Sequence, residues 1–267
     1  MSNQVSTKVL SSKLFDVIDR ASNNDLSVLV KYISRAVITE KLTSSKEYQT
    51  YFPDHQKYKN LIEREIRLFG GNTLVNFVRK DGPDYTEIVK DVADKLKVKY
   101  DKDLEVEDIE DLILAKTLSD AFEQMEDKDK LLVLKDLGLN YQKVPKKLPA
   151  SELLTIFNLS DVSAYQIALI VADGIAKDVL GYGFKISENP KFREILNVLS
   201  KPISLALTGI LSALDILGPA YRVTIPCVIH VAMLRKQQAL PETKRLTYQA
   251  ISQELEPTTI DNLKEKA

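Results

Sequence analysis

The chain has 267 residues and a mass of 30.1 kDa, which is enough to bury a substantial core without disulfides or metal ions. Its 37 basic and 38 acidic residues nearly cancel, and its pI is near 6.2, so net charge does not direct it toward nucleic acid or a strongly acidic partner. The single cysteine, Cys227, excludes an internal disulfide and a multi-cysteine zinc site.

No secretory signal is visible at the amino terminus. Residues 1–8 read Met-Ser-Asn-Gln-Val-Ser-Thr-Lys and lack a basic region followed by an apolar run that ends in small residues. A single cysteine also suits a reducing compartment. We therefore expect a cytoplasmic protein, with peripheral association with a membrane as an additional expectation.

Charge is distributed unevenly along the chain. Residues 1–150 carry 51 charged side chains, whereas residues 151–235 carry only 14. Two prolines and three lysines in residues 143–149 mark a solvated segment between these regions, because proline interrupts a helix and lysine favours water. The pattern predicts three parts, namely a charged helical region at 1–148, an apolar helical bundle at 149–236 and a polar helical tail at 237–267.

Helical periodicity dominates the charged region. In residues 84–98, apolar side chains recur at positions 85, 88, 89, 92 and 96, which form one stripe of a helix. Asp84 and Glu87 are spaced as a capping box at its start. Two further helices are predicted from about residue 106 to 125 and from 128 to 137, the second closed by Gly138.

The apolar region carries helix signals too. Ser163 and Gln166 are spaced as a capping box before the apolar run at 167–172, and Asn189 followed by Pro190 is typical of a helix start. Alternating strand patterns bounded by turn dipeptides are absent from the sequence. We therefore predict an all-α, multi-helix fold.

Residues 202–234 are the most informative stretch, because Asp215 and Arg222 are the only charged side chains in it. Its first half is apolar on all sides, which is typical of a helix in a protein core or a bilayer. The longest uncharged run, 202–214, has 13 residues and falls short of the ~18 to 20 that span a membrane. A buried core helix is the favoured interpretation, and a membrane-inserting hairpin and a partner-binding surface are the alternatives.

Two prolines draw attention to these charges. A proline inside a helix frees the carbonyl four residues earlier, which is that of Asp215 for Pro219 and that of Arg222 for Pro226. We hypothesise that Asp215 and Arg222 form a buried ion pair that sets the angle between two apolar helices. The alternative is a separate charge at each of two solvated kinks. With Tyr221, these residues are the candidate structural or interaction residues.

Four phrases carry a resemblance to a known family: Arg-Leu-Phe-Gly-Gly-Asn-Thr at 67–73, the helical phrase at 87–98, Tyr-Gln-Ile-Ala-Leu-Ile-Val-Ala at 165–172 and Gly-Pro-Ala-Tyr-Arg-Val-Thr-Ile-Pro at 218–226. They resemble the YaaW family of uncharacterised bacterial proteins, and the match spans about Lys41 to Arg235. The resemblance implies a helical protein grouped with ubiquinol-cytochrome c chaperone-like domains. It brings no catalytic residue.

Histidine is scarce, and no catalytic or metal site is predicted. His230 lies in the apolar phrase Val-Ile-His-Val-Ala, which favours a histidine satisfied within a core over a ligand. His55 has Asp54 beside it and Glu63 and Glu65 downstream, but the spacing completes no metal site. Helix capping by Asp54 is the preferred interpretation. An enzyme centred on His55 stays a third hypothesis.

Three other motifs favour ordinary structure over a functional site. Seven acids crowd residues 101–111 but lack the spacing and the glycine of a calcium loop, so we expect a solvated helix start. Cys227 lies among apolar neighbours, which favours a buried, inert thiol. The lysines at 143, 146 and 147 support only a weak, salt-sensitive phosphate contact, so no nucleic-acid partner is expected.

The sequence thus favours a non-enzymatic protein without cofactors. We expect its apolar carboxy-terminal half to engage another protein or the membrane surface, in a chaperone-like assembly or stress role. The alternative is a membrane-inserting or pore-forming protein that uses residues 202–234 as an apolar hairpin. An uncovered apolar patch well above a few hundred Å² would mark an interface.

Overall fold

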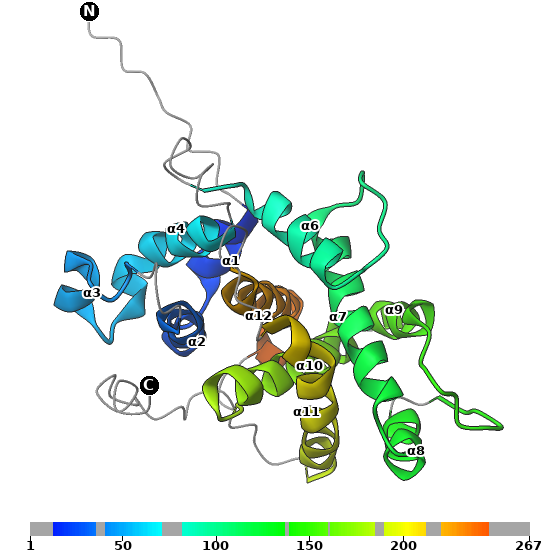
Figure 1. Ribbon diagram of the computed structural model, residues 1–267. Helices are drawn as coiled ribbons and strands as arrows, with labels where there is room; N and C mark the ends of the chain where they lie inside the picture. The colour runs from blue at the N-terminus through cyan, green and yellow to red at the C-terminus, as the bar shows by residue number, and fades with distance from the viewer. Residues whose placement is uncertain are drawn as a thin grey trace, which may run out of the picture.

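Helices make up the regular secondary structure of this protein (Figure 1). The computed structural model describes residues 13–35, 41–70, 82–136, 139–159, 161–184, 190–211 and 220–245, and no strand occurs in these segments. The helices are α1 (Lys13–Arg20), α2 (Asn23–Ser34), α3 (Lys46–Tyr51), the 3-10 helix η1 (His55–Tyr58), α4 (Lys59–Gly70), α6 (Tyr85–Lys95), α7 (Val106–Glu123), α8 (Asp127–Asp136), α9 (Ala150–Leu159), α10 (Asp161–Leu180), α11 (Pro190–Leu211) and α12 (Tyr221–Ala239). The all-α prediction is confirmed.

The first two helices follow directly from local sequence. Ser22 caps α2, since its hydroxyl accepts a hydrogen bond from the Asp25 N–H at 3.2 Å while Asp25 Oδ2 accepts one from the Ser22 N–H at 3.0 Å. These reciprocal bonds satisfy backbone donors that a helix start leaves unpaired. α1 buries Leu14, Val17 and Ile18, which are spaced at i, i+3 and i+4, so it turns one apolar face to the core.

The predicted stripe of α6 is confirmed. Tyr85, Ile88, Val89 and Val92 are all buried in this helix. Asp84 occupies the cap position but makes no side-chain cap hydrogen bond, so the predicted capping box is not formed. Burial of the stripe, rather than the cap, therefore accounts for the position of α6.

The other predicted helix ends agree with the structure in part. α7 begins at Val106 and α11 begins at Pro190, as predicted; proline suits a first turn because its missing N–H would have no partner there. α10 begins at Asp161, so Ser163 lies inside the helix and not at its cap. Gly138, the predicted stop after α8, lies outside the described residues.

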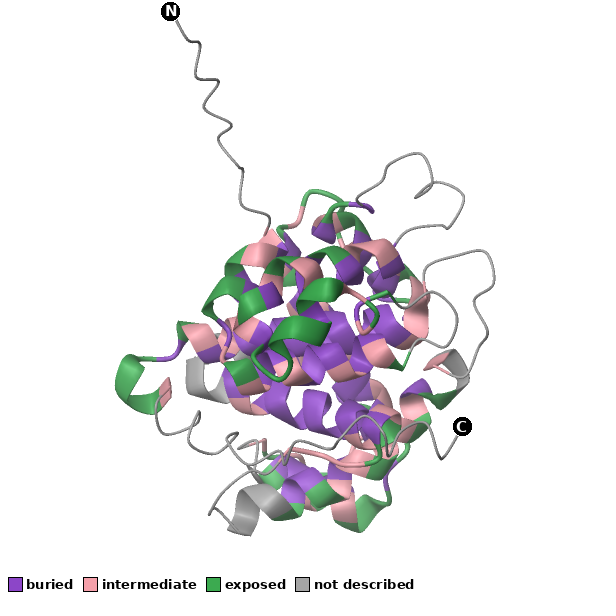
Figure 2. Ribbon diagram, turned by 90° about the vertical axis from the view of Figure 1, so that its left-hand side faces the viewer, coloured by how far each residue is buried: buried purple, intermediate pink, exposed green. Residues whose placement is uncertain are grey.

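α12 is the central helix of the fold (Figure 1). Every residue from 223 to 234 is buried, and α12 packs against α1, α2, α4, α6, α7, α10 and α11. Its sequence is apolar all round because its neighbours cover it all round. Figure 2 shows buried residues concentrated in the interior and exposed residues on the outer helices. The interpretation as a buried core helix is thus confirmed for residues 223–234.

α11 is covered on one face only. Ile203 and Leu207 are buried, whereas Lys201, Leu205 and Thr208 are exposed. The expectation of a helix buried on all sides is therefore wrong for this part of the apolar stretch, because α11 packs on α7 and α10 and leaves its other face to solvent. In the described part of the chain, no helix combines the length and the hydropathy that crossing a membrane requires.

The proposed boundary near residue 148 lies between α8 and α9. Helices from both sides of it meet at α12, which packs against α7 as well as α10. α7 also packs against α9 and α11, which lie beyond the boundary. The division into parts at 1–148, 149–236 and 237–267 stays a prediction, and the structure describes the third part only as far as Arg245.

Candidate functional site

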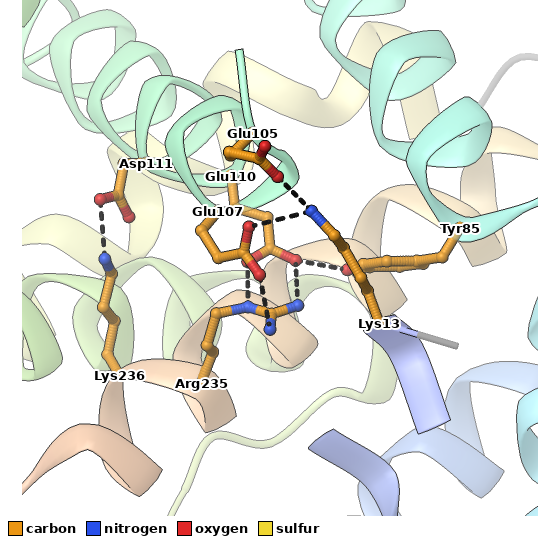
Figure 3. Close-up of polar contacts among 8 residues, drawn as sticks. All are labelled: Lys13, Tyr85, Glu105, Glu107, Glu110, Asp111, Arg235 and Lys236. Atoms are coloured by element: carbon orange, nitrogen blue, oxygen red, sulfur yellow. Dashed lines mark hydrogen bonds and ion pairs between the residues drawn. The ribbon is translucent and has the colours of Figure 1, made fainter. Parts of the chain in front are cut away.

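A cluster of polar side chains joins four helical segments beside the carboxyl end of α12 (Figure 3). We name it the Arg235 network; its members are Lys13, Tyr85, Glu105, Glu107, Glu110, Asp111, Arg235 and Lys236. They come from α1, α6, α12 and the start of α7. The network therefore ties the charged amino-terminal region to the apolar central helix.

Arg235 and Glu110 form the centre of this network. Arg235 donates from Nε to Glu110 Oε2 at 2.8 Å and from Nη2 to Glu110 Oε1 at 3.3 Å. The Tyr85 hydroxyl donates to Glu110 Oε1 at 2.8 Å, and Arg235 Nη1 lies 3.2 Å from Glu107 Oε1. A two-pronged guanidinium–carboxylate pair fixes geometry as well as charge, so these bonds hold α6, α7 and α12 in one arrangement.

The outer members of the network are closer to water. Lys236 Nζ lies 2.7 Å from Asp111 Oδ2, and Lys13 pairs with Glu105 and, at 3.7 Å, with Glu107. The Lys13 and Glu105 side chains are largely exposed, and exposed ion pairs contribute little to stability. The buried pair at the centre therefore dominates the energetics of the cluster.

Burial governs the protonation behaviour of this centre. It raises the pKa of the Glu110 carboxyl, while the charge and hydrogen bonds of Arg235 and the hydroxyl of Tyr85 oppose the rise. Burial first, and the negative charge of Glu110 next, raise the pKa of Tyr85 well above its ordinary value, so its hydroxyl keeps its proton. Both Glu110 oxygens already accept bonds from fixed donors. The arrangement thus suits a structural junction.

Glu110 is the residue that the sequence interpretation missed. It was assigned to a solvated acidic helix start, but it is 1% exposed. A signal was present, because Glu110 falls in the helical stripe of Val106, Ile109, Ile113 and Leu114, all of which are buried. A carboxylate inside an apolar stripe requires a buried partner. The expectation of a solvated acidic segment is therefore wrong at Glu110.

His55 lies in a cluster of rings formed by α3 and η1. Its Nδ1 is hydrogen-bonded with the Tyr58 hydroxyl, and its ring centroid is 5.6 Å from that of Tyr58 and 5.8 Å from that of Phe52. The Phe52 ring in turn lies 5.1 Å from the Tyr48 ring. With Tyr51, these residues form what we name the aromatic tip, which lies at the edge of the molecule in Figure 1.

The surroundings of His55 do not favour acid–base chemistry. It is buried, and this burial, with a smaller effect of Lys31, lowers its pKa to about 4, against an opposing effect of Asp54. Asp54 precedes η1 but makes no side-chain cap hydrogen bond, so the predicted capping role is wrong. Glu63 pairs with Arg67 at 3.6 Å. Among the described residues, no group of three potential ligands is placed to hold a metal ion.

His230 and Cys227 both lie in the covered part of α12. Burial lowers the pKa of His230 to about 4, although a hydrogen bond with the Asp25 carbonyl at 3.2 Å opposes the shift. Burial also raises the pKa of the Cys227 thiol, so the nucleophilic thiolate is disfavoured. The predicted burial of the histidine and of the thiol is confirmed, but His230 is only half satisfied, because its Nδ1 has no hydrogen-bond partner among the described residues.

The structure describes only some of the five candidate interaction residues. Asp215 and Pro219 lie outside the described residues, so their hypothetical ion pair and kink stay predictions. Pro226 is buried within α12, which continues through it, so the expected interruption of the helix there is wrong. Tyr221 lies under the Lys95 ammonium, with Nζ 4.4 Å from the ring centroid.

Arg222 lines a surface pocket of about 270 Å³. Val179, Leu211 and Val223 provide apolar lining, and the pocket also contains the polar side chains Arg35, Asp178 and Thr208. Its walls thus come from the end of α2 and from α10, α11 and α12. We name it the Arg35–Arg222 pocket. The structure brings Arg222 together with Arg35, a residue that the sequence interpretation did not connect with it.

Relatives of this chain occur among bacterial proteins. A UPF0174 protein of Helicobacter pylori strain J99 is 38% identical over 215 residues, which cover 79% of this chain and 85% of the relative. A second UPF0174 protein of that strain is 35% identical, with 75% of this chain and 98% of the relative covered. The UPF0174 protein YaaW of Escherichia coli K12 is 28% identical, with 72% and 76% covered. No family model and no solved structure matches the chain.

Proposed function

The chain belongs to the UPF0174 family, and from its structure we propose that it is a non-enzymatic protein-binding protein with a chaperone-like role and that the aromatic tip is its contact surface. The resemblance to the YaaW family is confirmed by these relatives. The grouping with ubiquinol-cytochrome c chaperone-like domains stays a prediction. Its relatives carry names that state no activity, so the proposal rests on the geometry of this chain.

The apolar composition of the carboxy-terminal region is largely explained by burial. Residues 223–234 are covered by neighbouring helices and offer nothing to a partner. Large apolar side chains that do reach the surface include Tyr51 and Phe52 on the aromatic tip, Leu131 on α8 and Leu205 on α11. Tyr51 and Phe52 are adjacent in the chain, and the exposure of two neighbouring aromatic residues is the single observation that carries the proposal.

The aromatic tip has the physical properties of a binding anchor. Tyr51 is 46% exposed and Phe52 is 39% exposed. The inner side of the Phe52 ring rests on Tyr48 and His55, with ring centroids at 5.1 and 5.8 Å. Aromatic side chains dominate the energetics of many interfaces, and a ring already held in place loses little entropy on binding.

The non-enzymatic part of the proposal is supported by the state of three reactive side chains. His55 and His230 have pKa values lowered to about 4, which makes both weak bases. Cys227 is buried and its pKa is raised. All three side chains are withdrawn from solvent, where a substrate would arrive.

A holdase assay tests the proposed role. A thermally unfolding client protein is mixed with the full chain, and its aggregation is followed by light scattering. We expect the parent chain to suppress aggregation and the double variant Tyr51→Ser, Phe52→Ser to lose most of this effect, because the aromatic contact area is removed. Circular dichroism must show the same melting temperature for both chains.

The matched control is Leu131→Ser, Leu205→Ser, which removes two side chains that are each 55% exposed on other helices. We expect this variant to behave as the parent does. Equal suppression by the parent and the aromatic-tip variant would contradict the assignment of the surface. Absence of suppression by the parent would contradict the chaperone-like role itself.

Contact with a membrane surface is the second candidate function, within a protein that we propose to be cytoplasmic. The observation that favours it is that the exposed lysines Lys46 and Lys57 lie on the same α3–η1 segment as Tyr51 and Phe52. Aromatic rings and lysines are both favoured at a lipid–water interface. Flotation with phosphatidylserine vesicles that is lost in Tyr51→Ser, Phe52→Ser would support it, and failure of the parent chain to float would exclude it.

A further inference from the structure

The Arg35–Arg222 pocket is a second candidate binding site, and none of its lining residues belongs to the aromatic tip. Its volume of about 270 Å³ falls slightly below the ~300 to 1,000 Å³ typical of sites for drug-sized ligands and cofactors. A ligand with a few non-hydrogen atoms fits.

Two arginines line the pocket. Arg35 uses Nη2 to donate a hydrogen bond to the Leu180 carbonyl at 3.1 Å, which fixes this side chain at the end of α10. Arg222 is half-buried and makes no hydrogen bond or ion pair with any described residue. Arginine presents a planar fork of donors that matches a planar carboxylate, so the pair is suited to bind one.

The charge balance of the pocket favours a monoanion. Among the described lining residues Asp178 is the one carboxylate, and its Oδ1 already accepts a hydrogen bond from the Ser204 hydroxyl. Two guanidinium groups and one carboxylate leave a net charge of about one positive unit, which a single carboxylate neutralises. A phosphate dianion would overcompensate this charge and be repelled by Asp178.

Apart from Thr208, the other described lining residues are apolar. Val223 is buried, and Val179 and Leu211 are half-buried beside the two arginines. Apolar walls next to a charged fork suit a molecule that combines a carboxylate with a short hydrocarbon chain, since the chain gains from leaving water. A carboxylate without a hydrocarbon chain, such as acetate, would lack the apolar contact. An alcohol with such a chain, such as hexanol, would lack the negative charge.

We propose that the Arg35–Arg222 pocket binds a short-chain aliphatic carboxylate, with the two guanidinium groups on the carboxylate and Val179, Leu211 and Val223 around the chain. The site is independent of the aromatic tip and of the chaperone-like role. It would give the protein a ligand-dependent state that neither of those features provides.

Calorimetric titration of hexanoate into the full chain tests this proposal. We expect saturable binding with a Kd on the order of 1 mM, as suits a ligand with few heavy atoms, and at least tenfold weaker binding of acetate and of hexanol. Arg222→Gln should weaken hexanoate binding at least tenfold, because one of the two guanidinium groups that bind the carboxylate is removed. Asp178→Asn should strengthen it severalfold, because a repulsive charge is removed.

The matched control is Lys57→Gln, which removes one positive charge from an exposed position on η1 and should leave the affinity unchanged. Equal hexanoate affinity of the parent and of Arg222→Gln would overturn the proposal. So would tighter binding of inorganic phosphate than of hexanoate, or binding of hexanol as tight as that of hexanoate. A folded Arg222→Gln chain is verified by its melting temperature.

Discussion

The two ends of α12 carry arginines in opposite surroundings. Arg235, near the carboxyl end, has a side chain only 16% exposed and is paired with Glu110 and Glu107. Arg222, near the amino end, lines an open pocket and is paired with no described residue. Within the described part of the chain, one helix thus holds one guanidinium that carboxylates neutralise and one that has no ion-pair partner.

This difference separates a structural charge from a candidate binding charge. A buried guanidinium must have its partner, because an uncompensated charge in a low-dielectric interior is strongly unfavourable. A guanidinium at a solvated pocket has no such requirement and contributes little to folding. Stability measurements on variants of α12 and its partners should therefore distinguish the two ends of the helix.

The largest effect is expected at the Arg235 end. Arg235→Met should reduce the free energy of unfolding by about 3 to 5 kcal/mol, because it leaves the buried Glu110 carboxylate without its partner. Urea denaturation followed by circular dichroism measures this loss. A variant as stable as the parent would remove the basis for the comparison.

A double variant shows whether the loss comes from the unpaired charge. Arg235→Met combined with Glu110→Gln keeps an acceptor for the Tyr85 hydroxyl but removes both charges. We expect it to recover most of the stability, because neutral groups can replace a buried ion pair at little cost. A double variant as unstable as the single one would point to lost packing instead.

The middle of α12 should make the protein sensitive to acid. The pKa of His230 is about 4 in the folded chain and 6.5 in the unfolded chain, so folding favours the neutral ring. The neutral ring contributes about 3 kcal/mol to the free energy of unfolding. This contribution is present above pH 6.5 and is lost as the pH falls from 6.5 through 4. Denaturation curves at pH 7 and pH 4 measure this.

His230→Gln is the matched variant for this pH effect. Gln retains a donor for the Asp25 carbonyl but cannot titrate in this range. Other groups also titrate between pH 7 and pH 4, so the comparison is between the two chains. We expect the parent to lose about 3 kcal/mol more than the variant over this range. Equal losses would show that His230 is not held neutral.

A smaller effect is expected when one donor is removed from the Arg235 network. Tyr85→Phe keeps the buried ring but deletes the hydroxyl that donates to Glu110 at 2.8 Å. We expect a loss of about 1.5 kcal/mol, which is typical of a hydrogen bond to a charged group. Thermal denaturation measures it. A loss as large as that of Arg235→Met would mean that Tyr85 and Arg235 act as one unit.

The smallest effect is expected at the other end of α12. Arg222→Gln should change the free energy of unfolding by less than about 0.5 kcal/mol, because this side chain has no buried partner among the described residues. Chemical denaturation measures the change. A loss of several kcal/mol would show that Arg222 is a structural charge like Arg235, and the comparison between the two ends would fail.

Predictions from the sequence are correct where a single short segment contains the whole pattern that determines a helix or the burial of a side chain. The stripe of Tyr85, Ile88, Val89 and Val92, the start of α11 at Pro190 and the buried environments of His230 and Cys227 are all found in the structure. Each depends on the periodicity or composition of a short stretch, which a single sequence displays directly.

Predictions from the sequence are wrong where contacts between two distant segments determine whether a side chain is buried or paired. Glu110 and Arg235 are 125 positions apart, so no local pattern identifies them as partners, and the prediction of a solvated acid at Glu110 is wrong. The pocket joins Arg35 to Arg222 across an even longer separation. The aromatic tip also depends on tertiary contacts, because the exposure of Tyr51 and Phe52 follows from which faces of α3 the neighbouring rings cover.

The sequence by itself determined the helical fold class, the family and the apolar character of the central helix, because periodicity, phrase similarity and hydrophobicity are properties of contiguous residues. Only the tertiary structure decided which charges of α12 have partners among the described residues and which do not. Burial and pairing depend on the helices that surround a side chain, and α12 is surrounded by helices from both halves of the chain.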